Sequence, residues 1–232
     1  MRHFAATAFA LILAATGMAK AEGQPVVVEL YTSQGCSSCP PADRLLGELA
    51  QRDDVIALAL HVDYWDYIGW KDQFASPAFT ERQRDYARSA GKRMVYTPQM
   101  IIGGTDHVVG NRFAEVSRLI QAQADRAPVI DLALERDGQK LTIDAKPLGK
   151  ITREVLIQLV RYRPSATVNV LRGENAGKNL KYYNIVDNWT VLRTWDGRAP
   201  LRVSTTVKGD LPLAVVIQYT GYGPILAAAR SR

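Results

Sequence analysis

The chain has 232 residues, of which 47% are hydrophobic and 22% are charged, and its formal net charge is +6. This length exceeds what one compact domain of ordinary size needs, and it fits an N-terminal leader followed by two domains of about 100 residues each. The Lys and Arg residues are dispersed, without a basic run or interleaved aromatic residues, which argues against a nucleic-acid-binding groove.

Residues 1–21 have the pattern of a secretory signal peptide. Arg2 precedes an apolar stretch without acidic residues, and Ala19 and Ala21 supply the small residues of a cleavage site. A membrane anchor is the alternative, but the stretch is shorter than the ~20 residues that span a bilayer. We therefore expect a cleaved chain without a membrane span, located in the periplasm or outside the cell.

Residues 22–127 are predicted to form one α/β domain in which strands and helices alternate. Short β-branched and apolar runs indicate strands, and apolar residues at helical spacing indicate helices. The order is β-α-β-α-β-β-α. The expected strands are residues 26–31, 55–62, 99–102 and 107–109, and the expected helices are residues 42–51, 76–90 and 112–126.

Residues 128–232 have a different pattern, with apolar and polar residues in alternation and turn residues between short segments. This is typical of antiparallel strands with one buried face, so we expect a sandwich-like all-β domain. The expected strands are residues 130–135, 140–144, 154–162, 167–171, 189–195, 201–207 and 213–219.

The two cysteines of the chain, Cys36 and Cys39, lie at the expected start of the first helix. A disulfide that closes so small a loop adds little stability, so the pair indicates chemistry rather than a structural link. A helix N-terminus favours a thiolate, which makes Cys36 the expected nucleophile and the more exposed, more acidic thiol. Cys39 is then placed to attack a mixed disulfide at Cys36. A zinc site would need two further ligands, and there is no other cysteine.

The first half of the chain resembles the thioredoxin-like superfamily in three respects. A strand leads into Cys36, Cys39 and Pro40 at a helix start, the strand and helix order agrees, and Thr97 and Pro98 open the third strand. This resemblance implies a cis Thr97–Pro98 bond whose backbone lies beside the disulfide and pairs with a bound thiol substrate.

Three segments, residues 30–36, 61–66 and 172–178, resemble more closely a family of exported bacterial proteins of unknown function. The resemblance covers nearly all of the chain after the leader. It implies an α/β thioredoxin-like domain followed by an antiparallel all-β (sandwich-like) domain.

Further residues are expected near the cysteines. Parallel strands end at a common edge, so Asp63, Tyr64 and Trp65 should lie close to Cys36, either to grip a substrate polypeptide or to pack under the second domain. The thioredoxin resemblance also suggests Glu29 as a buried acid that takes the proton of the resolving thiol. One residue more than in thioredoxins separates Glu29 from the first cysteine.

The leading interpretation is a thiol-disulfide oxidoreductase that acts on exported protein or peptide thiols, uses a redox partner protein and needs no bound cofactor or metal. One alternative is a metallochaperone that holds Cu(I) on Cys36 and Cys39, with His61 or Met100 as a further ligand. Another is a non-catalytic binding or redox-sensing module. Residues 173–178 are one residue too short for a phosphate-binding loop, so we do not expect nucleotide binding.

Overall fold

The structure is a computed structural model that describes residues 24–231, so the expected signal peptide lies outside the described residues. The first half of the chain alternates strands and helices in the expected order. Its elements are β1 (Val26–Thr32), α1 (Pro40–Leu49), β2 (Val55–His61), a 3-10 helix (Asp66–Ile68), α2 (Pro77–Ser89), β3 (Gln99–Ile102), β4 (Asp106–Val109) and α3 (Phe113–Ala124).

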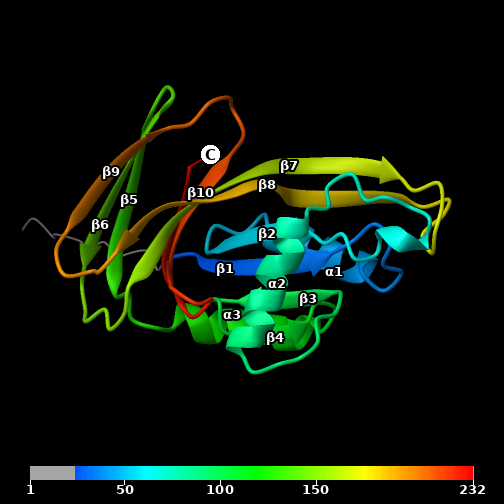
Figure 1. The fold of residues 1–232 in the computed structure, drawn as a ribbon, viewed down its shortest axis with the longest axis horizontal. Helices are drawn as coiled ribbons and strands as arrows, with labels where there is room; N and C mark the ends of the chain where they lie inside the picture. Colours follow the sequence, from blue (N-terminus) through cyan, green and yellow to red (C-terminus); the bar gives the residue numbers. More distant parts are fainter. Residues whose placement is uncertain (1–23, 232) are drawn as a thin grey trace, which may run out of the picture.

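The second half of the described chain consists of strands joined by turns. They are β5 (Ile130–Asp137), β6 (Lys140–Pro147), β7 (Val155–Asn169), β8 (Asn179–Trp195), β9 (Leu201–Thr206), β10 (Leu213–Tyr219) and β11 (Ile225–Ser231). The strands form an eight-stranded sheet in the order β11-β10-β7-β8-β2-β1-β3-β4 and a separate three-stranded sheet in the order β5-β6-β9. Figure 1 shows β7 and β8 running alongside β2, and the small sheet at one end of the molecule.

The expected fold class is wrong. The chain is not a thioredoxin-like α/β domain followed by an all-β domain, because β7, β8, β10 and β11 belong to the same sheet as β1 to β4. β8 lies parallel to β2, with Ala59 opposite Ile185, and therefore continues the sheet beyond the edge that β2 would otherwise leave open. The division predicted between residues 127 and 128 stays a prediction.

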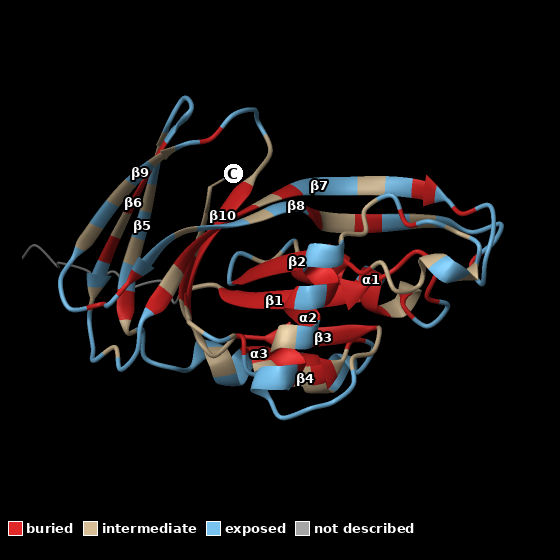
Figure 2. Cartoon of the chain, viewed as in Figure 1, coloured by how far each residue is buried: buried red, intermediate tan, exposed pale blue. Residues whose placement is uncertain are grey.

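Helices cover both faces of the β1–β2–β3 region because successive side chains of each strand point to opposite faces. On one face, α1 and α3 pack against a buried cluster that includes Val28, Leu30 and Met100. On the other face, α2 packs against a cluster that includes Tyr31 and Ile101, and residues of β7, β8, β10 and β11 extend this cluster. Figure 2 shows β1, β2 and β3 buried along their length, whereas β7 and β8 each contain buried, intermediate and exposed stretches.

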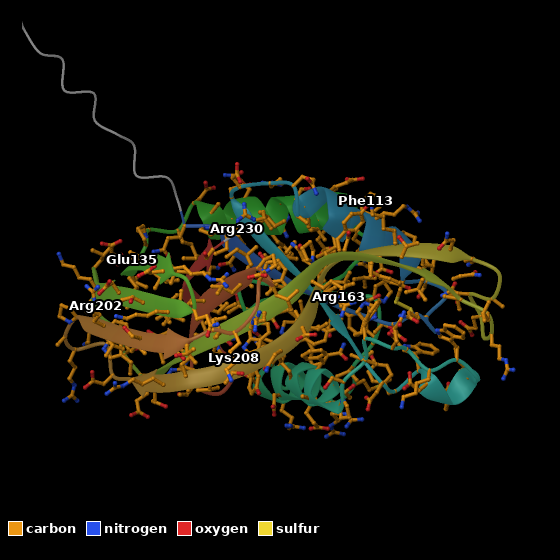
Figure 3. The ribbon with its side chains drawn as sticks, turned by 90° about the horizontal axis from the view of Figure 1, so that it is seen from above. Phe113, Glu135, Arg163, Arg202, Lys208 and Arg230 are labelled. Carbon is orange, nitrogen blue, oxygen red and sulfur yellow. A yellow bond between two sulfur atoms is a disulfide. The ribbon has the colours of Figure 1, made fainter. Side chains whose placement is uncertain are left out.

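A third core lies between the two sheets, where residues such as Leu141 and Ile143 of β6 pack with Ile157 of β7 and Val215 of β10. The edge strand β11 is also tied to the first half of the chain. The Arg230 guanidinium, labelled in Figure 3, donates to the carbonyl oxygens of Val55 and Arg52. None of the helices in the described part of the chain is long and apolar enough to cross a membrane.

The strand register determines which residues meet at the sheet edge that precedes α1. β1 and β2 are parallel, with Thr32 opposite His61, and β3 is antiparallel to β1, with Gln99 opposite Tyr31. The ends of β1 and β2 and the start of β3 therefore share one edge. The prediction that these three strands belong to one sheet, with both cysteines at the start of the following helix, is confirmed.

Candidate redox site

Cys36 and Cys39 form a disulfide at the N-terminus of α1. Cys39 is the N-cap residue of the helix, and Pro40 and Pro41 occupy its first turn, where a missing N–H group leaves no helical hydrogen bond unmade. Both cysteines are buried, with 1% of Cys36 and none of Cys39 exposed. The expected difference in exposure is therefore not seen in the disulfide form.

The Thr97–Pro98 bond is cis, as the resemblance implied. Pro98 lies near the first turn of α1, since a Cβ added at Gly110 would be 3.3 Å from Pro98 Cβ and 3.1 Å from Ala42 Cβ. Gly110 N also donates to Pro98 O at 2.9 Å. The segment that opens β3 is thus close to the helix that begins at Cys39.

Among the aromatic-loop residues, Trp65 reaches the segment before β3. Its Nε1 donates to Thr97 Oγ1 at 2.7 Å, and its Cβ is 3.2 Å from where a Cβ of Gly35 would be. Trp65 therefore bridges the loop that precedes Cys36 and the segment that contains the cis-proline.

Asp63 and Tyr64 are held by α2 instead. Thr80 Oγ1 donates to Asp63 Oδ1, and the hydroxyl of Tyr64 donates to Gln83 Oε1 at 3.1 Å. Burial raises the pKa of Tyr64 to about 12, so this hydroxyl stays protonated at neutral pH. The two side chains position the loop, and the structure shows no contact between them and the disulfide.

The structure does not bring Glu29 to the disulfide. Its side chain points to the α2 face of the sheet, whereas α1 and the cysteines belong to the opposite face. There the carboxylate accepts hydrogen bonds from Arg82 at 2.7 and 2.9 Å, from Tyr86 at 2.7 Å and from Tyr31 at 3.0 Å. Glu29 therefore forms a buried ion pair with Arg82, which joins α2 to the sheet. The Arg82 guanidinium also lies 3.6 Å from the ring centre of Trp189.

A different carboxyl group, that of Asp43, lies on the cysteine side of the sheet. Asp43 N donates to Cys39 O at 3.1 Å, so the two residues are one helical turn apart, a spacing that places Cβ atoms about 6 Å from each other. Asp43 Oδ1 accepts a hydrogen bond from Thr32 Oγ1 at 2.8 Å, and Oδ2 is buried without a hydrogen-bond partner among the described residues. Burial raises the pKa of Asp43 to about 7, although His61 and the Thr32 hydroxyl act in the opposite direction.

His61 and Asp72 form a second buried pair behind the redox loop, which we define as residues 33–39. Their Nδ1 and Oδ2 atoms are 2.7 Å apart, and both side chains are fully buried. Burial by itself would raise the pKa of Asp72, but His61 and the N–H groups of Gln34 and Phe74 together lower it. Asp72 thus links His61 to the backbone of the redox loop through Gln34 N, at 2.8 Å.

The tip of the β7–β8 hairpin, residues 170–178, contacts the redox loop from the other half of the chain. The buried Asn175 Nδ2 donates to Gln34 O at 2.9 Å and to Cys36 O at 3.0 Å. Its Oδ1 accepts a hydrogen bond from Lys178 Nζ at 2.9 Å. Trp70 Nε1 donates to the Gln34 side chain at 2.7 Å. Figure 1 shows the end of this hairpin and the 3-10 helix at the same end of the molecule.

Sequence reasoning missed Asp43, Asp72 and Asn175. A signal was available for Asp43, which follows Cys39 by four residues on the buried side of α1. Asn175 lies in the segment 172–178 that carries the family resemblance, but no pattern in the sequence linked it to Cys36, which is 139 residues away.

The residues named as further Cu(I) ligands are placed differently. His61 Nδ1 is engaged by Asp72, and Met100 is buried in the core beneath α1 and α3. Across residues 24–231 there is no group of three or more His, Cys, Asp or Glu side chains arranged to hold a metal ion.

Two solved structures are similar to this chain. A protein of Agrobacterium tumefaciens is 32% identical, with a TM-score of 0.77 and coverage of 90% of this chain and 94% of its own. HBP35 of Porphyromonas gingivalis is 14% identical, with a TM-score of 0.64 and coverage of 90% of this chain and 75% of its own, which shows a likeness of fold alone. No curated protein matches the chain.

The sequence pattern of one protein family, described as "Protein of unknown function (DUF1223)", matches residues 27–218. The match includes the disulfide, the cis-proline segment and the hairpin tip that contacts the redox loop. The chain therefore belongs to the DUF1223 family of proteins of unknown function.

Proposed function

We propose that the protein is an exported thiol-disulfide oxidoreductase that exchanges the Cys36–Cys39 disulfide with protein or peptide thiols. The observation that carries the proposal is the position of the disulfide at a helix N-terminus, with a buried carboxyl of near-neutral pKa one turn from Cys39. The helix dipole favours the thiolate of a cysteine that precedes the helix, and the thiolate is the reactive form.

In the reduced protein, the Cys36 thiolate attacks a substrate disulfide and forms a mixed disulfide, and one substrate sulfur leaves as a thiolate. The Cys39 thiol then loses its proton, and its sulfur attacks Cys36. The second substrate thiolate leaves, and the Cys36–Cys39 disulfide forms. The two electrons that the cysteines lose reduce the two sulfurs of the substrate, and the same steps in reverse oxidise a substrate dithiol.

Asp43 is the carboxyl that supports the step at Cys39, in place of Glu29. A general base works best when its pKa is near the working pH, and the pKa of Asp43, about 7, meets this condition. Its unpartnered Oδ2 is free to accept a proton. Glu29, in contrast, holds a buried Arg82 and cannot give up its charge without leaving that cation unpaired.

Substrate access involves Trp65 and the Thr97–Pro98 segment. Because the disulfide is buried, a side chain that covers it has to move before a substrate chain can reach Cys36. Trp65 bridges Gly35 and Thr97, so opening of its hydrogen bond to Thr97 would expose the redox loop and the segment before β3 together. Asp63 and Tyr64 anchor the other end of the loop to α2.

Export fits this chemistry, since disulfides form and persist in oxidising compartments. In the proposed setting the signal peptide is removed on export, and a redox partner protein restores the oxidation state of the cysteine pair after each turnover. The reduction potential of the Cys36–Cys39 pair, relative to that of the partner protein, sets the net direction of electron transfer.

The test is to trap the mixed disulfide with a fluorescent peptide disulfide. Cys39→Ser should accumulate a covalent adduct at Cys36, because the resolving thiol is absent, whereas Cys36→Ser should accumulate far less. Absence of an adduct in both variants would contradict the proposal. Tight binding of one Cu(I) by the reduced wild type, without any exchange, would support the metallochaperone instead.

A further inference from the structure

Asn175, in the hairpin tip, directs both donors of its side-chain amide to the backbone of the redox loop. Asn175 is fully buried, and its Nδ2 group donates to the carbonyl oxygens of Gln34 and Cys36. Its Oδ1 accepts from Lys178 Nζ, so two consecutive hydrogen bonds connect a lysine ammonium with the backbone of Cys36.

The conformation of the hairpin tip holds Asn175 toward the redox loop. Gly177 N donates to Val170 O at 2.8 Å, and Lys178 N donates to Asn175 O at 3.1 Å, so the tip is a closed turn. Gly177 has a φ of +77°, which a residue with a side chain adopts only at a cost. These contacts lie within the hairpin tip and involve neither cysteine, so the tip itself holds the donor in place.

The connection from Lys178 to Cys36 should affect the two redox states unequally. The Cys36 sulfur is uncharged in the disulfide and negative in the thiolate, and a positive charge nearby stabilises the thiolate. Lys178 itself is exposed, but its ammonium donates to the buried Asn175 amide and polarises it, which strengthens the Asn175 donor that faces Cys36 O. The other titratable groups behind the redox loop are Asp72, Asp43 and His61.

We propose that Asn175 and Lys178 are positioning residues that keep the Cys36 thiol acidic and thereby set the redox equilibrium of the cysteine pair. This inference rests on the proposed function and adds a role for the second half of the chain. The residues act through the Cys36 backbone and do not contact a substrate.

The experiment compares Lys178→Met with a control that also removes one exposed lysine, Lys146→Met, in the full mature chain. Lys146 lies on β6 in the separate three-stranded sheet, away from the redox loop. The first measurement is the pH dependence of Cys36 alkylation by iodoacetamide in a Cys39→Ser background. The second is the equilibrium constant of the cysteine pair with glutathione.

Lys178→Met should raise the Cys36 pKa, slow alkylation near pH 6 by up to about tenfold, and make the disulfide harder to reduce by a similar factor, about 30 mV. Asn175→Asp, which removes the donor, should act in the same direction and more strongly. Lys146→Met should stay close to the wild type in both measurements.

A purely structural contact would stabilise the oxidised and reduced forms equally and would leave the equilibrium constant unchanged. The proposal is therefore wrong if Lys178→Met and Asn175→Asp fold and keep both the alkylation profile and the glutathione equilibrium of the wild type. Should Asn175→Asp fail to fold, Lys178→Met decides alone, since it leaves the Asn175 bonds in place. Failure of the wild type to exchange with glutathione at all would instead contradict the proposed function.

Discussion

Replacement of Asp43 by Asn should change how the stability of the disulfide form depends on pH. Burial raises the pKa of Asp43 from an ordinary value of 3.8 to about 7. A raised pKa means that the folded chain holds a proton that the unfolded chain releases, so the stabilisation is complete below pH 4 and is lost as the pH rises toward 7. At about 1.4 kcal/mol per unit, the free energy of unfolding should fall by about 4 kcal/mol across this window.

In Asp43→Asn the side chain at position 43 has no carboxyl group to gain or lose a proton. The Asn side chain keeps an oxygen that can accept the hydrogen bond from Thr32. The variant should therefore gain about 4 kcal/mol relative to the wild type between pH 4 and pH 8. Urea unfolding of both oxidised proteins across this range measures the difference, and contributions from groups such as Asp72 largely cancel in it. Glu48→Gln, an exposed position on the same helix, is the control for loss of one charge. A difference between wild type and Asp43→Asn that does not vary with pH would refute the reasoning.

Three further outcomes are expected. Asp43→Asn should slow resolution of a preformed Cys36 mixed disulfide at pH 7 by about 100-fold, a typical effect of losing a general base, and an unchanged rate in a stopped-flow assay would exclude Asp43 from that step. Glu29→Gln should destabilise the protein by about 3–5 kcal/mol in urea, since it leaves Arg82 buried and unpaired, but should not slow resolution in the folded protein. Trp65→Phe, which removes the donor to Thr97, should speed reduction of the disulfide by dithiothreitol, and equal rates would argue against Trp65 as a barrier to access.

The elements of the first half were predictable because each has a strong local pattern. The strand predicted at residues 26–31 is β1, and the apolar spacing after Pro40 is α1. The second half was less predictable. Alternation shows that a segment is a strand and which face is buried, but it does not show which open edge the strand joins. Strands predicted at residues 154–162 and 167–171 are one long strand, β7, which continues through Pro164 despite its missing N–H group.

Some residues of the candidate site could also be placed from the sequence, and others could not. The sequence was sufficient to place Cys36, Cys39 and the Thr97–Pro98 segment at one edge, because parallel strands end together. Alternation in β1 directs Glu29 to the α2 face, whereas the carboxyl group on the cysteine side of the sheet, that of Asp43, comes from α1. Asn175 depends on a pairing between β2 and β8 that no local pattern encodes.

The pairing of β8 with β2 has a consequence for how the chain is made. The residues of β2 are buried, and until β8 is synthesised the outer edge of β2 lacks its neighbouring strand. Exposed edges of this kind readily pair with other chains and lead to aggregation. A growing chain presents this edge for as long as residues 128–195 take to be synthesised. Chaperones that shield strand edges should therefore raise the yield of the intact protein, and expression of residues 22–127 alone should give mostly insoluble material.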